Sequence, residues 1–260
     1  MTLELAGKIA LVTGASRGLG QDLALSLARA GADLVIVSRE AAGARATVEA
    51  VTALGRRCVV ASADVTDEAA MDRAVAGAIA EVGRIDILVC VAGVGTPRRP
   101  IWQSDSADYR ACFDVNVLGV MLAMRAVLPG MVARKSGRVI VIGGTYGHKG
   151  VAQSALYAAS KWALRGLAKS AALEVGASGI TVNVVAPGGV DGPRLRSLFQ
   201  ASADASGESF ADVKGRFVAK TALGDLVSSA DIAAAVLYLA SERGRMVTGQ
   251  DIVVDAGTIV

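Results

Sequence analysis

Seven short apolar runs rich in β-branched residues recur along the chain, and longer stretches with helical spacing lie between them. The predicted strands are residues 9–13, 34–38, 58–61, 85–91, 138–142, 181–185 and 251–254. Apolar residues at three- and four-residue spacing predict helices over 17–29, 42–54, 67–82, 106–134, 153–177 and 230–241. This alternation indicates parallel strands joined by right-handed crossovers. The sequence therefore predicts a single α/β domain over residues 1–260, built on a doubly wound parallel sheet.

Composition favours a sheet that is buried on both faces. Hydrophobic residues make up 53% of the 260 residues and aromatic residues only 4%, so Ala, Val, Leu and Ile must fill the core. The 27 Lys and Arg against 24 Asp and Glu give a net charge of +3, spread over short clusters. A nucleic-acid binder would carry a continuous basic face, so we expect no nucleic-acid partner.

No apolar stretch is predicted to cross a membrane. The longest candidate, residues 115–132, is broken by Arg125. Glu4 and Lys8 interrupt the N-terminal region, where a secretory leader would be apolar. The sequence therefore predicts a soluble cytoplasmic protein with no membrane partner.

The cysteines and the histidine give no sign of a metal site. Cys58, Cys90 and Cys112 have no CxxC spacing, and His148 is the only histidine in the sequence. We expect the thiols to be reduced and buried, as in a reducing compartment, and we expect no metal.

Residues 189–220 are poorer in strand signal and richer in small polar residues than their surroundings. Ligands of open α/β sheets bind beyond the carboxyl ends of the strands, so an insertion after a late strand is well placed to cover them. The segment is interpreted as a mobile substrate lid. The alternative is an ordinary surface excursion.

A glycine-rich loop follows the first predicted strand. Residues 13–20 read Thr-Gly-Ala-Ser-Arg-Gly-Leu-Gly and open directly into a helix. Glycines permit a tight turn and close approach of the backbone to a pyrophosphate, which the N–H groups of the helix N-terminus bind. This context predicts a dinucleotide site rather than a structural turn without a ligand. The predicted contacts are Gly14, Ser16, Arg17, Gly18, Leu19 and Gly20.

The end of the second strand bears on the choice of dinucleotide. An NAD enzyme places a carboxylate there to hold the ribose 2′-hydroxyl, whereas this chain has Ser38 followed by Arg39. Arg39 and Arg17 can both pair with a 2′-phosphate. These residues favour NADP(H), although the neighbouring Glu40 argues against it, and an exposed Arg39 without a ligand is the alternative.

Tyr157 and Lys161 are four residues apart on a predicted helix and so share one face. A free tyrosine has a pKa near 10, and acid-base work at neutral pH needs it lowered by about 3 units. A lysine ammonium one turn away, together with an oxidised nicotinamide, stabilises the phenolate. Tyr157 could then exchange a proton with a substrate hydroxyl or carbonyl while a hydride moves.

With these motifs the chain resembles the short-chain dehydrogenase/reductase family, in its NADP-preferring branch, over essentially its whole length. The matching features are the loop at 13–20, Asp64-Val65, Asn116, Tyr157-x-x-x-Lys161, Pro187-Gly188 and Thr248-Gly249. The resemblance implies a Rossmann fold and an NADP(H)-dependent oxidoreductase that interconverts a ketone or aldehyde and a secondary alcohol. It also implies a homotetramer joined through the helices predicted at 106–134 and 153–177.

The resemblance further implies residue roles. Tyr157 is the acid-base residue, Lys161 holds the nicotinamide ribose, and Asn116 steadies a water behind Lys161. Asp64 and Val65 contact the adenine. The remaining expected cofactor contacts lie after the fourth and sixth strands: Cys90, Gly93, Pro187, Gly188 and Val190.

The chain departs from the family where a substrate-binding serine usually stands, thirteen residues before the tyrosine. That position is Gly144. Loss of a comparable hydrogen-bond donor lowers the rate by roughly 10² to 10³. Thr145 and Gln153, in the same segment, are the expected substrate contacts. His148 is another polar candidate, although an exposed loop histidine is the simpler interpretation.

Gly144 leaves two other hypotheses open: a non-catalytic dinucleotide-binding sensor, and a cofactor-dependent epimerase. The substrate is a small carbonyl or alcohol compound. Four arginines flank the expected crevice and suggest an anionic group on it. They are Arg98, Arg99, Arg194 and Arg196.

Overall fold

The computed structural model of the chain describes residues 3–260. Seven strands form one parallel sheet in the order β3-β2-β1-β4-β5-β6-β7, which confirms the predicted α/β class. The strands are β1 (Ile9–Thr13), β2 (Asp33–Ser38), β3 (Cys58–Ser62), β4 (Ile87–Cys90), β5 (Gly137–Ile142), β6 (Ile180–Pro187) and β7 (Asp251–Val254). Each lies close to a predicted run, because β-branched apolar runs of this length are typical of doubly buried strands.

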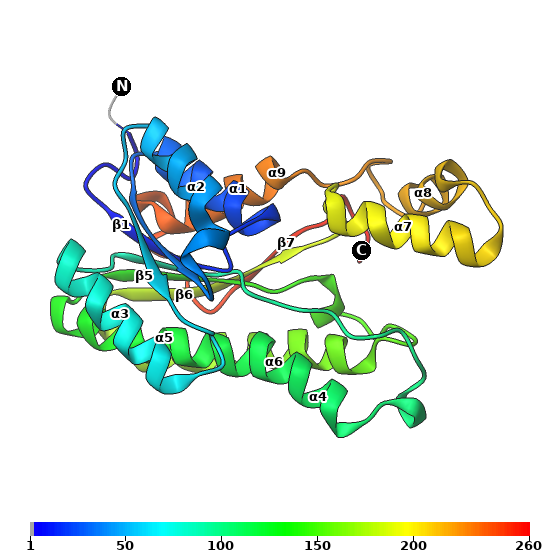
Figure 1. The fold of residues 1–260 in the computed structure, drawn as a ribbon, viewed down its shortest axis with the longest axis horizontal. Helices are drawn as coiled ribbons and strands as arrows, with labels where there is room; N and C mark the ends of the chain where they lie inside the picture. Colours follow the sequence, from blue (N-terminus) through cyan, green and yellow to red (C-terminus); the bar gives the residue numbers. More distant parts are fainter. Residues whose placement is uncertain (1–2) are drawn as a thin grey trace.

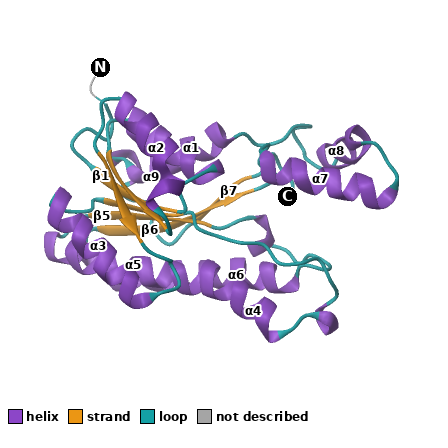
Figure 2. Ribbon diagram, viewed as in Figure 1, coloured by secondary structure: helices purple, strands orange, loops and turns teal. Residues whose placement is uncertain are grey.

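Helices cover both faces of the sheet (Figures 1 and 2). One layer holds α1 (Gly18–Arg29), α2 (Ala41–Ala53) and α9 (Ser229–Ala240). The opposite layer holds α3 (Glu68–Val82), α4 (Ser106–Phe113), α5 (Gly119–Arg134) and α6 (Ala155–Val175). Short 3₁₀ helices lie at Ile101–Gln103, Thr145–Gly147, Gly176–Ser178 and Glu242–Gly244. The domain therefore has three layers, with the sheet in the middle.

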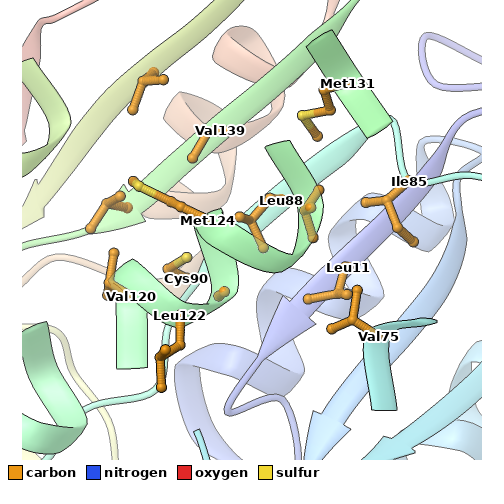
Figure 3. Close-up of a cluster of buried hydrophobic side chains, with 14 of the residues drawn as sticks. Leu11, Val75, Ile85, Leu88, Cys90, Val120, Leu122, Met124, Met131 and Val139 are labelled. Carbon is orange, nitrogen blue, oxygen red and sulfur yellow. The ribbon is translucent and has the colours of Figure 1, made fainter. Parts of the chain in front are cut away.

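Alternate side chains of each strand enter two separate cores. Leu11 of β1 and Leu88 of β4 lie in the core under α3, α5 and α6, where they meet Val75 and Leu122 (Figure 3). Val12 of β1 enters the other core, under α1 and α9. Because successive side chains of a strand point to opposite faces, a strand of a sheet covered on both sides is apolar at most positions. Arg138 of β5 and Asn183 of β6 are buried polar exceptions.

The helix predicted over 106–134 is interrupted. α4 ends at Phe113, a π turn follows over Asp114–Leu118, and α5 begins at Gly119. The N–H of Gly119 bonds to the carbonyl of Asp114, five residues back, which widens the helix there. Taken together, Ser106–Arg134 is long and apolar enough to cross a membrane by length and composition. Its inner side packs on β4 and β5, as core helices of soluble domains do.

The segment 189–220 contains two helices that the sequence analysis did not predict, α7 (Pro193–Ser206) and α8 (Phe210–Val218). They lie beyond the sheet, next to the end of β7 (Figure 1). Phe199 of α7 packs against Phe210 and Phe217 of α8, which gives the pair a small core of its own. Small polar residues on the outer surfaces hid this helical pattern in the sequence.

Leu88→Ala should lower the free energy of unfolding by roughly 2–5 kcal/mol, because the side chain is fully buried between β4 and the helices above it. Leu223→Ala is the matched control, since Leu223 is 79% exposed. Urea denaturation at equal protein concentration measures both. Equal losses in the two variants would contradict the described core.

Candidate active site

The carboxyl ends of β1 and β4 lie side by side at the point where the strand order reverses. Thr13, the last residue of β1, ties them together: its hydroxyl accepts hydrogen bonds from the backbone N–H groups of Val91 (3.1 Å) and Ala92 (3.3 Å). Ligands of open α/β sheets bind at such a switch point. The glycine loop and the segment around Gly93 therefore border one crevice.

The glycine loop fits a pyrophosphate. A Cβ at Gly14 would lie 2.7 Å from the Cα of Ala92, and one at Gly20 would collide with the carbonyl oxygen of Gly14. Only glycine allows so tight a turn. α1 begins at Gly18 with no side-chain cap from Arg17 and no acidic residue in its first turn. Its first N–H groups therefore face the loop without a partner side chain, which suits an anion.

Two exposed arginines stand where a 2′-phosphate is expected. Neither Arg17 nor Arg39 forms an ion pair with a carboxylate of residues 3–260. The Ser38 hydroxyl donates to the Glu40 carbonyl at 2.9 Å. Asp64 accepts hydrogen bonds from Thr66, which, with a smaller contribution from the charge of Arg39, hold the pKa of that carboxyl below its usual value. Asp64 is therefore a carboxylate held in place by Thr66 just after β3.

Tyr157 and Lys161 lie together near the amino end of α6. The Lys161 Nζ donates to the carbonyl of Ile142 at 3.1 Å and lies 5.7 Å from the centroid of the Tyr157 ring. Burial, helped by the charge of Arg194, lowers the pKa of Lys161 to about 8. Burial also raises the pKa of Tyr157, while Arg194 opposes this through its charge and a side-chain hydrogen bond. The phenol is thus protonated unless further positive charge stabilises its anion.

Asn116 sits in the π turn and is buried. Its amide donates to the Val94 carbonyl and to the Ser160 hydroxyl, both at 3.0 Å, and its oxygen accepts from the Val94 N–H at 2.8 Å. These bonds hold the segment after β4 against α6. The π turn directs the Asn116 side chain toward both Val94 and Ser160.

The expected substrate side is formed by the segment after β5. A Cβ at Gly144 would meet only the Pro187 carbonyl, at 3.8 Å, so the serine position is open space. Thr145 is buried, whereas Gln153 is exposed and its carbonyl accepts from the Arg99 N–H at 3.1 Å. The Tyr146 ring packs edge-on against Tyr157 with centroids 5.6 Å apart, a contact that sequence analysis missed.

The remaining expected cofactor contacts differ in whether their side chain or only their backbone can face a ligand. Cys90 is 2% exposed and its side chain lies in the core (Figure 3), where burial raises the pKa of the thiol to about 12. Only its backbone can face a ligand. Gly93 lies beside the site, since a Cβ there would be 3.8 Å from Lys161 Nζ. Gly188 bonds to Val254 of β7 at 2.9 Å.

Val190 and Val65, two further expected cofactor contacts, each pack against another part of the fold. Val190 forms a parallel bridge with Val227, which anchors the chain just before α7. Val65 packs against the start of α5, where a Cβ at Gly119 would lie 2.9 Å from its methyl group.

Of the four arginines expected at the crevice, two are neutralised. Arg99 pairs with Asp108 at 3.0 Å, and the exposed Arg196 side chain pairs with Asp191 at 2.9 Å. Arg194 instead lies over Tyr157, with its Cζ 5.6 Å from the ring centroid. Sequence analysis identified the charge of Arg194 but not this contact, which depends on the direction in which α7 leaves β6.

Comparison with known proteins gives one consistent result. The profile of the family described as short chain dehydrogenase matches residues 8–203. The cis-4-hydroxycyclohexanecarboxylate dehydrogenase of Sinomonas cyclohexanicum is 34% identical over 97% of this chain and 96% of its own. The 3-oxoacyl-(acyl-carrier-protein) reductase of Escherichia coli (strain K12) is 34% identical over 98% of both chains. The crystal structure of carveol dehydrogenase from Mycobacterium avium in complex with NAD superposes with a TM-score of 0.91 and 31% identity over 99% of both chains.

Lys161→Met should stabilise the fold by on the order of 3 kcal/mol at pH 7. The pKa of Lys161 is about 8 in the folded protein against an ordinary 10.5, so below pH 8 the wild type bears the full cost of a buried charge. Between pH 8 and 10.5 the unfolded chain binds the extra proton, and wild-type stability rises relative to the variant.

Urea denaturation of wild type and Lys161→Met at pH 7 and pH 10 measures this difference. Lys220→Met, at an exposed lysine, is the control for removing a surface charge. A stability difference that does not shrink with rising pH would contradict the buried, unpaired ammonium.

Proposed function

The chain belongs to the short-chain dehydrogenase/reductase family, and from that premise we propose that it is an NADP(H)-dependent oxidoreductase interconverting a ketone or aldehyde and a secondary alcohol. Membership makes it an oxidoreductase acting on alcohols or ketones. The observation that carries the finer proposal is the placement of Tyr157 and Lys161 on one face of α6, beside the crevice bordered by the glycine loop.

Bound NADP(H) supplies the hydride acceptor or donor. Tyr157 accepts the hydroxyl proton of the alcohol as the hydride leaves the carbinol carbon, so that alcohol and NADP⁺ become carbonyl, NADPH and a proton. In the reverse direction Tyr157 returns the proton to the carbonyl oxygen. Because burial raises the pKa of Tyr157, its phenolate needs positive charge nearby. Lys161 and Arg194 are the cations beside it.

Asn116 supports this pair as a positioning residue, because its hydrogen bonds to Val94 and Ser160 fix the segment after β4 against α6. Thr145 and Gln153 are proposed to line the substrate side. The pair α7 and α8 is proposed to act as the substrate lid within the single domain, since Arg194 reaches from α7 to Tyr157.

The cofactor preference rests on three residues. Arg17 and Arg39 are exposed at the glycine loop and at the end of β2, and Ser38 takes the place of the carboxylate that favours NAD. The related carveol dehydrogenase was crystallised with NAD, so the preference is a property to measure for this chain.

The proposed assembly is a cytoplasmic homotetramer. Large apolar side chains on α4, α5 and α6 are exposed in the single chain, among them Tyr109, Met121, Trp162 and Leu173. Arg194, which lies over Tyr157 and has no ion pair among residues 3–260, supports an anionic group on the substrate, and Arg98 is exposed on the segment after β4. A non-catalytic sensor is not favoured, because the relatives are dehydrogenases and reductases.

NADPH should bind at least about tenfold more tightly than NADH, because a charge-assisted hydrogen bond contributes about 1.5–3 kcal/mol. Arg39→Ala should remove most of this difference by weakening NADPH binding alone. Arg45→Ala is the control, since Arg45 is exposed but pairs with Glu49. Fluorescence titration with both cofactors measures the affinities, and an equal or reversed preference in the wild type would refute the NADP(H) proposal.

Tyr157→Phe should lower kcat by roughly 10²- to 10⁴-fold while leaving NADPH affinity within about threefold, because only the proton-transferring hydroxyl is lost. Tyr238→Phe, on α9, is the control. The assay follows NADPH absorbance with secondary alcohols and ketones, starting with cis-4-hydroxycyclohexanecarboxylate and carveol. Activity retained in Tyr157→Phe would place the proton donor elsewhere.

A further inference from the structure

Position 144 offers no side-chain hydrogen-bond donor to the reacting oxygen. In carbonyl reduction, negative charge builds on that oxygen as the hydride reaches the carbon, and a preorganised donor stabilises it. The Tyr157 hydroxyl can donate to one side of the reacting oxygen. On the other side Gly144 has no side chain, and the space where one would stand contains only the Pro187 carbonyl within 4 Å.

Arg194 crosses the mouth of this site. It belongs to the first turn of α7, and its guanidinium lies over Tyr157 with Cζ 5.6 Å from the ring centroid. Its Nη2 lies 2.9 Å from where a Cβ of Gly95 would be, so it also reaches the segment after β4. The guanidinium therefore spans from the lid to the opposite wall, above the tyrosine.

The backbone before α7 fixes the origin of this side chain. The Asp191 N–H bonds to the Val227 carbonyl at 2.8 Å, and the Val227 N–H bonds to the Gly189 carbonyl at 3.1 Å. Pro193 then starts α7 with its φ already restricted. Arg194 thus follows a segment that is tied to the rest of the fold.

The charge of Arg194 is uncompensated where it lies. A cation near a helix N-terminus opposes the helix dipole, and the first turn of α7 has no acidic residue. Arg196, two residues on, pairs with Asp191, whereas Arg194 has no ion pair with any carboxylate of residues 3–260. Lys161 lies beneath as a second cation. Such a violation of local electrostatics is expected at a functional site.

We propose that Arg194 donates the hydrogen bond to the reacting oxygen of the substrate that no side chain at position 144 can donate. This inference rests on the proposed function, since it needs Tyr157 as the acid-base residue. A guanidinium has five N–H donors and keeps its charge. One of its N–H groups can therefore donate to the substrate oxygen while the guanidinium stays near the phenol of Tyr157. The attraction between the guanidinium and the substrate oxygen grows as the oxygen becomes negative. This charge attraction ends when Tyr157 delivers the proton to the oxygen.

Arg194→Met should lower kcat by roughly 10²-fold and leave the NADPH dissociation constant within about threefold, because the donor acts mainly in the transition state. Arg194→Lys should retain part of the rate. Arg196→Met, on the same turn with its charge already paired to Asp191, should keep the wild-type kcat.

Gly144→Ser in the Arg194→Met background should recover at least about tenfold of the lost kcat, because it restores a donor from the other wall. A second measurement needs no turnover. The ultraviolet absorbance of tyrosinate is followed against pH in the cofactor-free protein, and the titration curve of Tyr157→Phe is subtracted to isolate Tyr157. Arg194→Met should raise the apparent pKa of Tyr157, since Arg194 opposes the effect of burial on that phenol. This titration keeps the inference testable if Gly144→Ser does not fold.

The failures are distinguishable. Activity in Tyr157→Phe would overturn the proposed function itself. An inactive Tyr157→Phe with an unchanged kcat in Arg194→Met would overturn only the role of Arg194. A rise in KM alone in Arg194→Met would show that Arg194 binds a distant anionic group instead. A kcat loss in Thr145→Ala but not in Arg194→Met would move the donor to Thr145.

Discussion

In a parallel sheet covered on both faces, the polar groups that can meet a ligand lie at the carboxyl ends of the strands, and the chemistry of this chain follows from that constraint. All residues of β1, β4, β5 and β6 are buried between the two helix layers. The glycine loop, the segment around Gly93 and Gly144 follow the carboxyl ends of strands, and Pro187 is the last residue of β6. The Thr13 hydroxyl, which accepts hydrogen bonds from Val91 and Ala92, holds the end of β1 against the segment after β4.

Within that edge, burial determines the electrostatics. Among residues 3–260 the Lys161 ammonium donates one hydrogen bond, to the Ile142 carbonyl, and its pKa falls to about 8 because the charged form is desolvated. The same burial raises the pKa of Tyr157. Two positive charges lie beside the phenol, those of Lys161 and Arg194. The site therefore favours a species that develops negative charge there.

The parts of the structure that sequence analysis predicted are those with local signals. Strand runs, the glycine loop and the four-residue spacing of Tyr157 and Lys161 depend on backbone periodicity, which neighbouring residues determine. The π turn at Asn116 depends on partners 22 and 44 residues away, Val94 and Ser160. The helices α7 and α8 have clear stops and caps at Gly207 and Ser209, but their three phenylalanines bury one another rather than joining the main core. The contact of Arg194 with Tyr157 has no local signal at all.

The missing side chains shape the site as much as those present. An open position at Gly144 and a bare backbone at Gly95 leave room for a long cation to enter from α7. A serine at position 144 would follow the carboxyl end of β5 in the sheet, whereas a donor on α7 belongs to the proposed lid. Under the proposed function, the movement that excludes water also brings the donor to the oxygen. The rate of the chemical step then depends on the position of α7, because the charge that stabilises the reacting oxygen is carried by the element that closes over it.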